Sequence, residues 1–223
     1  TSRVIFEDTT IELAAEAVVS TGVLEIDGDV FVKGDHTFEY NSTNPMEIDA
    51  ESTLHLNDEV TLKMGKSNVD SNQPLIFTDT TSVIYFNDSN LIITGSGANF
   101  SNGKMKVHGN VTCSVDSLDP TYGFSFGDGS CTGFNFELSQ GAVWKLINGV
   151  VSFNCDNEDM FTFKDNLSEF DLRDTIFNIA VPTTFADGTI VLSPDIGEFR
   201  FSDNGYLVAN NMEIYCSCGD FDY

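Results

Sequence analysis

The chain is a succession of short segments in which apolar and polar residues alternate, and most of these segments end in Asn, Asp or Gly. The stretch "VLEIDGDVFVKG", which begins at Val23, places apolar residues at alternate positions on both sides of a polar turn. Alternation with a period of two predicts strands with one buried face, and Asn, Asp and Gly favour turns. The pattern therefore predicts an all-β chain.

Degenerate copies of this unit return along the chain as "STLHLNDEVTLKMG", "SVIYFNDSNLIITG", "KMKVHGNVTCSV", "VWKLINGVVSFNC" and "EFRFSDNGYLVANN". Their turns recur at steps of roughly 20 to 30 residues, which suits one coil of three short strands. The residues expected to face inward are Leu24, Ile26, Val30, Val32, Leu54, Leu56, Val60, Leu62, Met64, Val83, Tyr85, Leu91, Ile93, Met105, Val107, Val111, Cys113, Val115, Trp144, Leu146, Val151, Phe153, Phe199, Phe201 and Leu207.

Two architectures produce such a pattern: a parallel β-solenoid, in which equivalent strands of successive coils stack, and an antiparallel β-sandwich or jelly roll built from hairpins. The coil-length repeat, the near absence of helical periodicity and the matching Val, Ile, Leu and Phe positions favour a right-handed parallel β-helix. Each repeat is then one coil, and no coil buries its apolar face without its neighbours.

The expected boundaries are an N-terminal cap or exchanged strand at residues 1–22, the solenoid at residues 23–215 and a C-terminal tail at residues 216–223. Residues 7–22 could form a capping helix, because Thr9 and Glu12 have capping-box spacing, or another coil, which Val18 and Val19 favour. The strand "RVIF" from Arg3 is a candidate to complete the sheet of a neighbouring molecule. The residues proposed for assembly are Val4, Ile5, Phe6, Ile214 and Tyr215.

The formal net charge is −25, while 41% of the residues are hydrophobic. So apolar a chain should fold, and so acidic a chain is a poor partner for nucleic acid. No apolar run is long enough to span a membrane. We expect an extracellular or surface location, with Asn-x-Ser/Thr glycosylation candidates at Asn41, Asn87, Asn99, Asn110 and Asn166.

Cysteines and acidic loops are the candidates for covalent and metal chemistry. The five cysteines show no zinc-binding spacing, and the disulfide candidates are Cys113, Cys131, Cys155, Cys216 and Cys218. A bridge between Cys113 and Cys131, one coil apart, is preferred, with a buried reduced cysteine as the alternative. No cofactor is expected apart from calcium at loop carboxylates, for which Asp128, Asp156 and Asp159 are weak candidates.

The pattern as a whole resembles the parallel β-helix proteins of bacterial surfaces, such as autotransporter passengers and polymorphic outer-membrane proteins, over most of residues 20–215. Their short motifs are mostly missing, and the single Phe-x-x-Asn match is "FEYN" from Phe38. The resemblance implies a surface protein. It carries over no catalytic residue, and "FDLRDT", with Asp171, Arg173 and Asp174, is the one stretch that could serve a polysaccharide-active enzyme.

We therefore expect a non-enzymatic extracellular structural protein, a solenoid subunit of a surface filament, fibre or layer whose partner is a second copy of itself. The alternatives are a carbohydrate-binding or adhesin module that takes glycans, and a lyase-like or hydrolase-like enzyme acting on polysaccharides. An exposed aromatic row would favour the glycan-binding alternative.

Overall fold

The structure is a computed structural model, and it describes residues 2–65, 74–95, 97–116, 123–126, 133–147, 149–153, 161–171, 175–179, 182–186, 189–192, 198–201, 206–210 and 213–216. From Thr175 onwards, Ile190 and Ile214 are the residues whose side chains it describes. The described residues form strands and turns without a helix. No helix among them is therefore long and apolar enough to cross a membrane.

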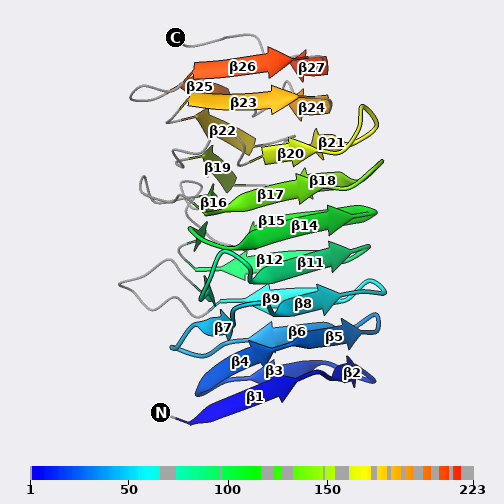
Figure 1. Ribbon diagram of the computed structural model, residues 1–223, viewed down its shortest axis with the longest axis vertical. Helices are drawn as coiled ribbons and strands as arrows, with labels where there is room; N and C mark the ends of the chain where they lie inside the picture. Colours follow the sequence, from blue (N-terminus) through cyan, green and yellow to red (C-terminus); the bar gives the residue numbers. More distant parts are fainter. Residues whose placement is uncertain are drawn as a thin grey trace.

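Strand pairing follows one rule: each strand pairs in parallel with the strand three places later in the chain. The exceptions are β10 with β13 and β20 with β23, which lie next to one another without a described ladder. Three consecutive strands therefore form one rung, and the rungs lie above one another from β1 at one end to β26 and β27 at the other (Figure 1). This arrangement contradicts the antiparallel alternative among the described strands.

The strands form three faces. Face A contains β1 Arg3–Glu7, β4 Val23–Asp27, β7 Met46–Ile48, β10 Leu75–Phe77, β13 Ala98–Phe100, β16 Gly123–Phe126, β19 Gly149–Phe153, β22 Thr175–Ile179 and β25 Glu198–Phe201. Face B contains β2 Thr10–Glu12, β5 Asp29–Lys33, β8 Thr53–Leu56, β11 Val83–Asn87, β14 Lys104–His108, β17 Asn135–Leu138, β20 Phe161–Phe163, β23 Pro182–Ala186 and β26 Tyr206–Asn210. Face C contains β3 Ala17–Val19, β6 Thr37–Tyr40, β9 Thr61–Met64, β12 Asn90–Thr94, β15 Asn110–Asp116, β18 Val143–Leu146, β21 Glu169–Asp171, β24 Thr189–Leu192 and β27 Glu213–Cys216.

Residues 3–19, for which a capping helix was one expectation, form the first rung instead. β1, β2 and β3 pair with β4, β5 and β6, so this segment continues the stack. The strand-favouring residues Val18 and Val19 outweigh the capping-box spacing of Thr9 and Glu12. The capping-helix interpretation was wrong, and the interpretation as another coil is confirmed.

The core consists of the inward residues of all three faces, stacked into ladders. Most of the positions expected to face inward are buried, from Leu24 and Ile26 in β4 to Trp144 and Leu146 in β18. The prediction was wrong in β11, where Ile84 and Phe86 are buried and Val83 and Tyr85 face outward. Side chains of Phe153, Phe199, Phe201 and Leu207 lie outside the description.

The core changes character along the stack. Aliphatic and Met side chains predominate in rungs two to five, whereas Phe and Trp predominate among the described core residues of rungs six and seven. Trp144 stacks on Phe170 with ring centroids 4.7 Å apart, and Phe136 meets Trp144 edge to face at 5.6 Å. These aromatic residues form part of the core.

The corners are held by side chains that bond to the next rung. The motif Asp-x-x-Ser occurs at residues 49–52, 79–82 and 165–168. The Ser82 hydroxyl donates to the Asp49 carbonyl of the rung below at 2.8 Å, and the Ser168 hydroxyl donates to the Ser139 carbonyl at 2.9 Å. The serines of this motif are buried, so they satisfy corner carbonyls that water does not reach.

A second corner device pairs an Asp with a Gly of the following rung. Asp88 has a positive φ of 44°, and its carboxylate accepts the Asn110 N–H at 2.8 Å across Gly109. Gly109 has a φ of 64°, and a Cβ there would lie 2.2 Å from the Asp88 Oδ1 atom. Asp8 and Gly28 repeat this contact at the corner between faces A and B.

Tyr40 joins the first three rungs at the corner between faces C and A. Its hydroxyl oxygen lies 3.0 Å from the Gly22 carbonyl oxygen and 2.8 Å from the Asn44 carbonyl oxygen, so its one hydrogen can be donated to either, and the Ser42 hydroxyl also donates to the Gly22 carbonyl. Burial raises the pKa of Tyr40, because the phenolate would be poorly solvated there.

We predict that Gly109→Ala destabilises the fold more than Gly141→Ala. Both glycines have a positive φ at the same corner, but an Ala Cβ at position 141 meets nothing within 4 Å. Backbone strain should cost about 1–2 kcal/mol in each, and the clash with Asp88 should add about 1–3 kcal/mol at position 109. Urea unfolding followed by the fluorescence of Trp144, the single tryptophan, measures the difference.

The matched test of that clash introduces Gly109→Ala into an Asp88→Gly background. There the loss of unfolding free energy caused by Gly109→Ala should fall to the loss caused by Gly141→Ala. Equal costs for the two glycine substitutions in the wild-type background would contradict the Asp–Gly contact.

We also predict that Tyr40→Phe lowers the free energy of unfolding at pH 7 by about 1–2 kcal/mol, because carbonyls lose their donor. Since the folded pKa of Tyr40 is raised, its contribution is complete below the ordinary value of about 10 and is lost as the pH rises through the folded pKa. The decline of stability above pH 10 should therefore be shallower in Tyr40→Phe. Tyr85→Phe is the control at pH 7, since the Tyr85 hydroxyl has no hydrogen bond with the described residues.

Candidate functional site

The first rung leaves core positions uncovered. Val4 pairs in register with Leu24, and Phe6 pairs with Ile26, both of which are buried. Val4 is nevertheless 45% exposed, and Phe6 is only partly buried, because no further rung lies beneath them among the described residues. Ile11, Ala17 and Val19 are partly buried in the same way. Within the part of the chain that the structure describes, this end of the stack is an open apolar surface.

Two outward positions of the first rung are apolar as well. Ile5 on face A is 52% exposed, and Val18 on face C is 58% exposed. The other strongly exposed apolar residues in the description are Ile147, Leu167 and Ile214. Exposed apolar side chains therefore gather around the rim of the first rung. The three strands of this rung also present a row of backbone groups that have no ladder partner on one side among the described strands.

In the last rung, the side chain of Ile214 is the one that the structure describes. Ile214 in β27 pairs with Ile190 in β24, which is fully buried. Ile214 is 37% exposed, although it occupies the same ladder as Ile190. Of the proposed assembly residues, the structure therefore finds Val4, Ile5 and Ile214 exposed and Phe6 partly buried, while the Tyr215 side chain lies outside the description. β1 pairs with β4 of its own chain and is not exchanged here.

An ion cluster sits on face A beside the open end. Arg3 pairs with Glu25 through one guanidinium nitrogen and with Glu47 through the other, at 3.2 Å. Glu25 and Glu47 are register neighbours on adjacent strands, and their side chains are only 11% and 23% exposed. Arg3 therefore offsets part of the repulsion between two stacked carboxylates.

Face B carries an outer row of aromatic rings. Phe31, His55 and Tyr85 are register neighbours on β5, β8 and β11. Phe31 stacks on His55 with centroids 4.2 Å apart and an interplanar angle of 11°, and His55 meets Tyr85 edge to face. One face of the Phe31 ring lies against one face of the His55 ring, so these two faces are not stacking platforms for sugars.

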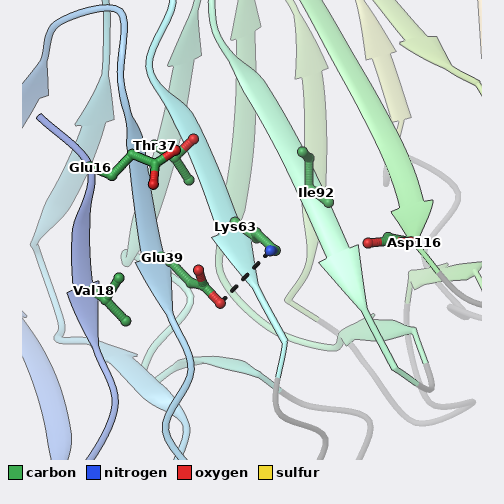
Figure 2. Close-up of a pocket in the computed structure, with 7 residues that line it drawn as sticks. All are labelled: Glu16, Val18, Thr37, Glu39, Lys63, Ile92 and Asp116. Atoms are coloured by element: carbon green, nitrogen blue, oxygen red, sulfur yellow. Dashed lines mark ion pairs between the residues drawn. The ribbon is translucent and has the colours of Figure 1, made fainter.

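Face C carries a shallow groove of about 260 Å³ that crosses β3, β6, β9, β12 and β15. Figure 2 shows Glu39 and Lys63 paired in its middle, at 3.8 Å, with Glu16 toward one end and Asp116 at the other. Val18 and Ile92 supply its apolar lining. Glu16 and Asp116 are exposed, and neither has an ion-pair partner among the described residues.

The calcium candidates Asp128, Asp156 and Asp159 lie outside the described residues, as do Arg173 and Asp174. Within the described residues, no group of three or more His, Cys, Asp and Glu side chains could hold a metal ion. Asp171 is 1% exposed and so does not present a carboxylate to solvent. Calcium binding stays a prediction.

The preferred disulfide is not formed at its described end. Cys113 is a free, fully buried cysteine whose ladder neighbours are Leu91 and Leu146. Burial raises the pKa of its thiol well above the ordinary value, so it remains protonated. Cys131, Cys155 and Cys218 lie outside the described residues, and so does the side chain of Cys216.

The glycosylation candidates differ in accessibility. Asn110 and Asn166 are exposed, Asn41 is half-buried, and Asn87 donates to the Asn57 side chain at 3.1 Å. The Asn99 side-chain oxygen is buried without a hydrogen-bond partner. Asn110 and Asn166 are therefore the best placed acceptors among the five.

Sequence reasoning missed the Arg3 cluster, the aromatic row and the groove. Each brings together residues on adjacent rungs, so finding it requires the register between strands about 20 to 30 residues apart. The Asp-x-x-Ser corner motif was visible in the sequence, because it recurs directly before a strand.

Comparison with protein-family models, with curated proteins and with solved structures found no match.

We predict that Arg3→Gln lowers stability by about 1–2 kcal/mol, because it leaves Glu25 and Glu47 adjacent without a cation. The value is discounted from that of a fully buried pair, since the Arg3 side chain is 48% exposed. Lys63→Gln, which breaks only the longer Glu39 pair, should cost less than about 0.5 kcal/mol. Thermal unfolding monitored by circular dichroism compares the two.

In a Glu25→Gln, Glu47→Gln background the loss of Arg3 should cost nothing measurable, because no carboxylate is left to neutralise. An undiminished cost there would show that Arg3 acts through packing rather than through charge.

Proposed function

We propose that this chain is a right-handed parallel β-solenoid that serves as a non-enzymatic structural subunit of an extracellular filament, fibre or layer, in which copies join end to end. The observation that carries the proposal is the first rung, where among the described residues the core ladders stop at the 45% exposed Val4 and the partly buried Phe6, together with Ile214 of the last rung, which is 37% exposed. The right-handed sense is supported by the strong preference of parallel crossover connections for that hand.

End-to-end joining is the simplest way to cover both ends. The interface would be head to tail, since one end presents β1, β2 and β3 and the other presents β25, β26 and β27. A head-to-tail contact that does not close on itself produces an open filament. The added rung would continue the same parallel ladders and the same apolar columns.

The magnitudes favour weak, concentration-dependent joining. Complete burial of one large apolar side chain contributes about 1.5–3 kcal/mol, and the side chains of the first rung are already partly covered. Five or six of them therefore contribute about 5–8 kcal/mol, near the lower part of the association cost of about 4–15 kcal/mol. Backbone hydrogen bonds, at about 0.5–1.5 kcal/mol each, supply the remainder.

The extracellular location is supported by the charge and by two accessible acceptor sites. A net charge of −25 keeps separate copies soluble until the ends meet. Asn110 and Asn166 lie at exposed corners, where a glycan would not disturb the stack.

We predict that the wild-type chain forms filaments as its concentration rises, and that Val4→Lys prevents this. In the monomer the lysine can reach water past the open rung, but in a joined end its ammonium group would be buried without a partner. Sedimentation velocity over a concentration series, with negative-stain electron microscopy, measures assembly.

Leu167→Lys is the matched control. Leu167 is 67% exposed and apolar but lies in a corner of the seventh rung, away from both ends. This variant should assemble as the wild type does, and circular dichroism should show both variants folded. A wild type that stays monomeric at high concentration, or a folded Val4→Lys that still forms filaments, would overturn the proposal.

A further inference from the structure

In a chain of net charge −25, the first four strands of face C carry no net charge on their outward side. The outward residues of β3, β6, β9 and β12 are Val18, Thr37, Glu39, Thr61, Lys63, Asn90, Ile92 and Thr94. Glu39 and Lys63 are the charged ones, and their charges are opposite. By contrast, the four strands of face A in the same rungs set one cation, Arg3, against the carboxylates Glu7, Glu25, Asp27 and Glu47. On this part of face C a second copy therefore meets little local repulsion.

Four of these residues form a single column on face C. In the strand register Val18 lies beside Glu39, and Glu39 lies beside Lys63. Lys63 in turn lies beside Ile92. From the first rung to the fourth, the column therefore reads apolar, acidic, basic, apolar. A second copy turned through 180° about an axis normal to face C presents the same column in reverse, so each charge meets the opposite charge and each apolar residue meets an apolar one. The column is complementary to itself, as an isologous contact requires.

The exposure and shape of this surface suit the same arrangement. Val18 is 58% exposed, and the side chains of Glu39 and Lys63 are 27% and 32% exposed, so all three can meet a partner. The groove runs beside the column (Figure 2). In its first two rungs Glu16 and Thr37, each two residues before a member of the column, line the other side. The groove therefore offers the column of a second copy a place to insert.

We propose that two copies pair face C to face C about a two-fold axis, each setting Lys63 and Ile92 into the groove of the other. Lys63 of each copy then faces Glu39 of the second copy, and Ile92 faces Val18. Because the same patch is used on both sides, the contact closes as a dimer. In an isolated pair Asp116, in the fifth rung, lies beyond the overlap of rungs one to four and meets no carboxylate of the second copy.

The size of the overlap makes this pairing weak. Rungs one and four lie about 14 Å apart, so the contact is smaller than the interfaces of stable complexes. Pairing should therefore depend on concentration. It uses neither end of the stack and is independent of end-to-end joining.

A pair of charge variants tests the two-fold contact against general electrostatics. Glu39→Lys leaves two cations in the column and Lys63→Glu leaves two carboxylates, so each variant should repel its own kind across the axis. In an equimolar mixture each cation of one variant faces a carboxylate of the other, and a heterodimer should form. Both variants remain strongly negative overall, so general charge predicts no such attraction.

The experiment is sedimentation equilibrium of the full chain in the end-blocked Val4→Lys background, up to about 1 mM protein and at about 0.15 M salt, where charges beyond roughly 8 Å are largely screened. We expect Val4→Lys to dimerise, each charge variant to raise the dissociation constant about tenfold, and the mixture to return it to within about threefold of the parent value. Asp116→Lys is the matched control: it makes the same charge change as Glu39→Lys outside the overlap, and it should not weaken pairing. Circular dichroism checks that each variant is folded.

A disulfide between copies is a second measurement that leaves the ion pair intact. In Val18→Cys with Ile92→Cys, the two positions lie about 14 Å apart within one chain, too far for a bridge, but they face each other across the axis. Mild oxidation should therefore give a covalent dimer, in which mass spectrometry finds position 18 joined to position 92. Neither single variant should link to itself at the new cysteine, because equal positions of the two copies lie three rungs apart.

The inference is overturned if Val4→Lys stays monomeric at about 1 mM, if the mixture of folded charge variants associates no more tightly than either variant alone, or if the folded double-cysteine variant forms no bridge between positions 18 and 92. These outcomes are separate from a failure of end-to-end joining, which appears as equal assembly of the wild type and Val4→Lys.

Discussion

The parallel ladder between each rung and the next is the interaction on which the rest of this structure depends. A strand pairs with the strand three places later, and the described pairings never join two strands of one rung. A single rung therefore satisfies little of its own backbone and buries little of its own apolar surface. Stability resides in the contacts between neighbouring rungs, as in other quasi-one-dimensional folds. Among the described residues, the first rung has a neighbour on one side only, so it lacks half of the contacts that stabilise the middle rungs.

This constraint also determines where charge can be placed. Each face repeats one set of outward positions at a spacing of about 4.8 Å, so carboxylates that share a column repel one another. On face A, Glu25 and Glu47 share a column and Arg3 lies against both. Many other acidic residues are at the corners, where Asp79 and Asp165 are bonded by backbone N–H groups and face water. A large net charge is compatible with close stacking because much of it lies at the corners.

Much of the fold was predictable because alternation reports burial directly. Leu54 and Leu56 are apolar residues flanked by polar ones, and both are buried as expected. The segment Val83–Phe86 is apolar at four consecutive positions, so alternation contains no information about which residues face inward. The buried residues are Ile84 and Phe86, which alternate with the buried Ser82 before them. Serine at a buried position reads as polar in any hydropathy pattern, although its hydroxyl is satisfied by the rung below.

The candidate surfaces were less predictable, because they depend on register. Val4 and Ile5 could be proposed from the apolar strand alone, and both are exposed. The pairing of Arg3 with Glu25 and Glu47, and the stacking of Phe31 on His55, require the number of residues in each corner. Corner lengths vary from rung to rung, so the residues that meet on an outer face cannot be counted off from a fixed repeat length.

The Asp–Gly corner contacts make the rungs unequal as evolutionary units. A solenoid can grow by duplication of a rung only where the new neighbours fit at every corner. A duplication that placed a residue with a Cβ above Asp88 would set it against the carboxylate that now lies under Gly109. The number of rungs is thus more easily changed at corners without such a contact. Two pairs of adjacent rungs should be inherited together, those joined by Asp8 with Gly28 and by Asp88 with Gly109.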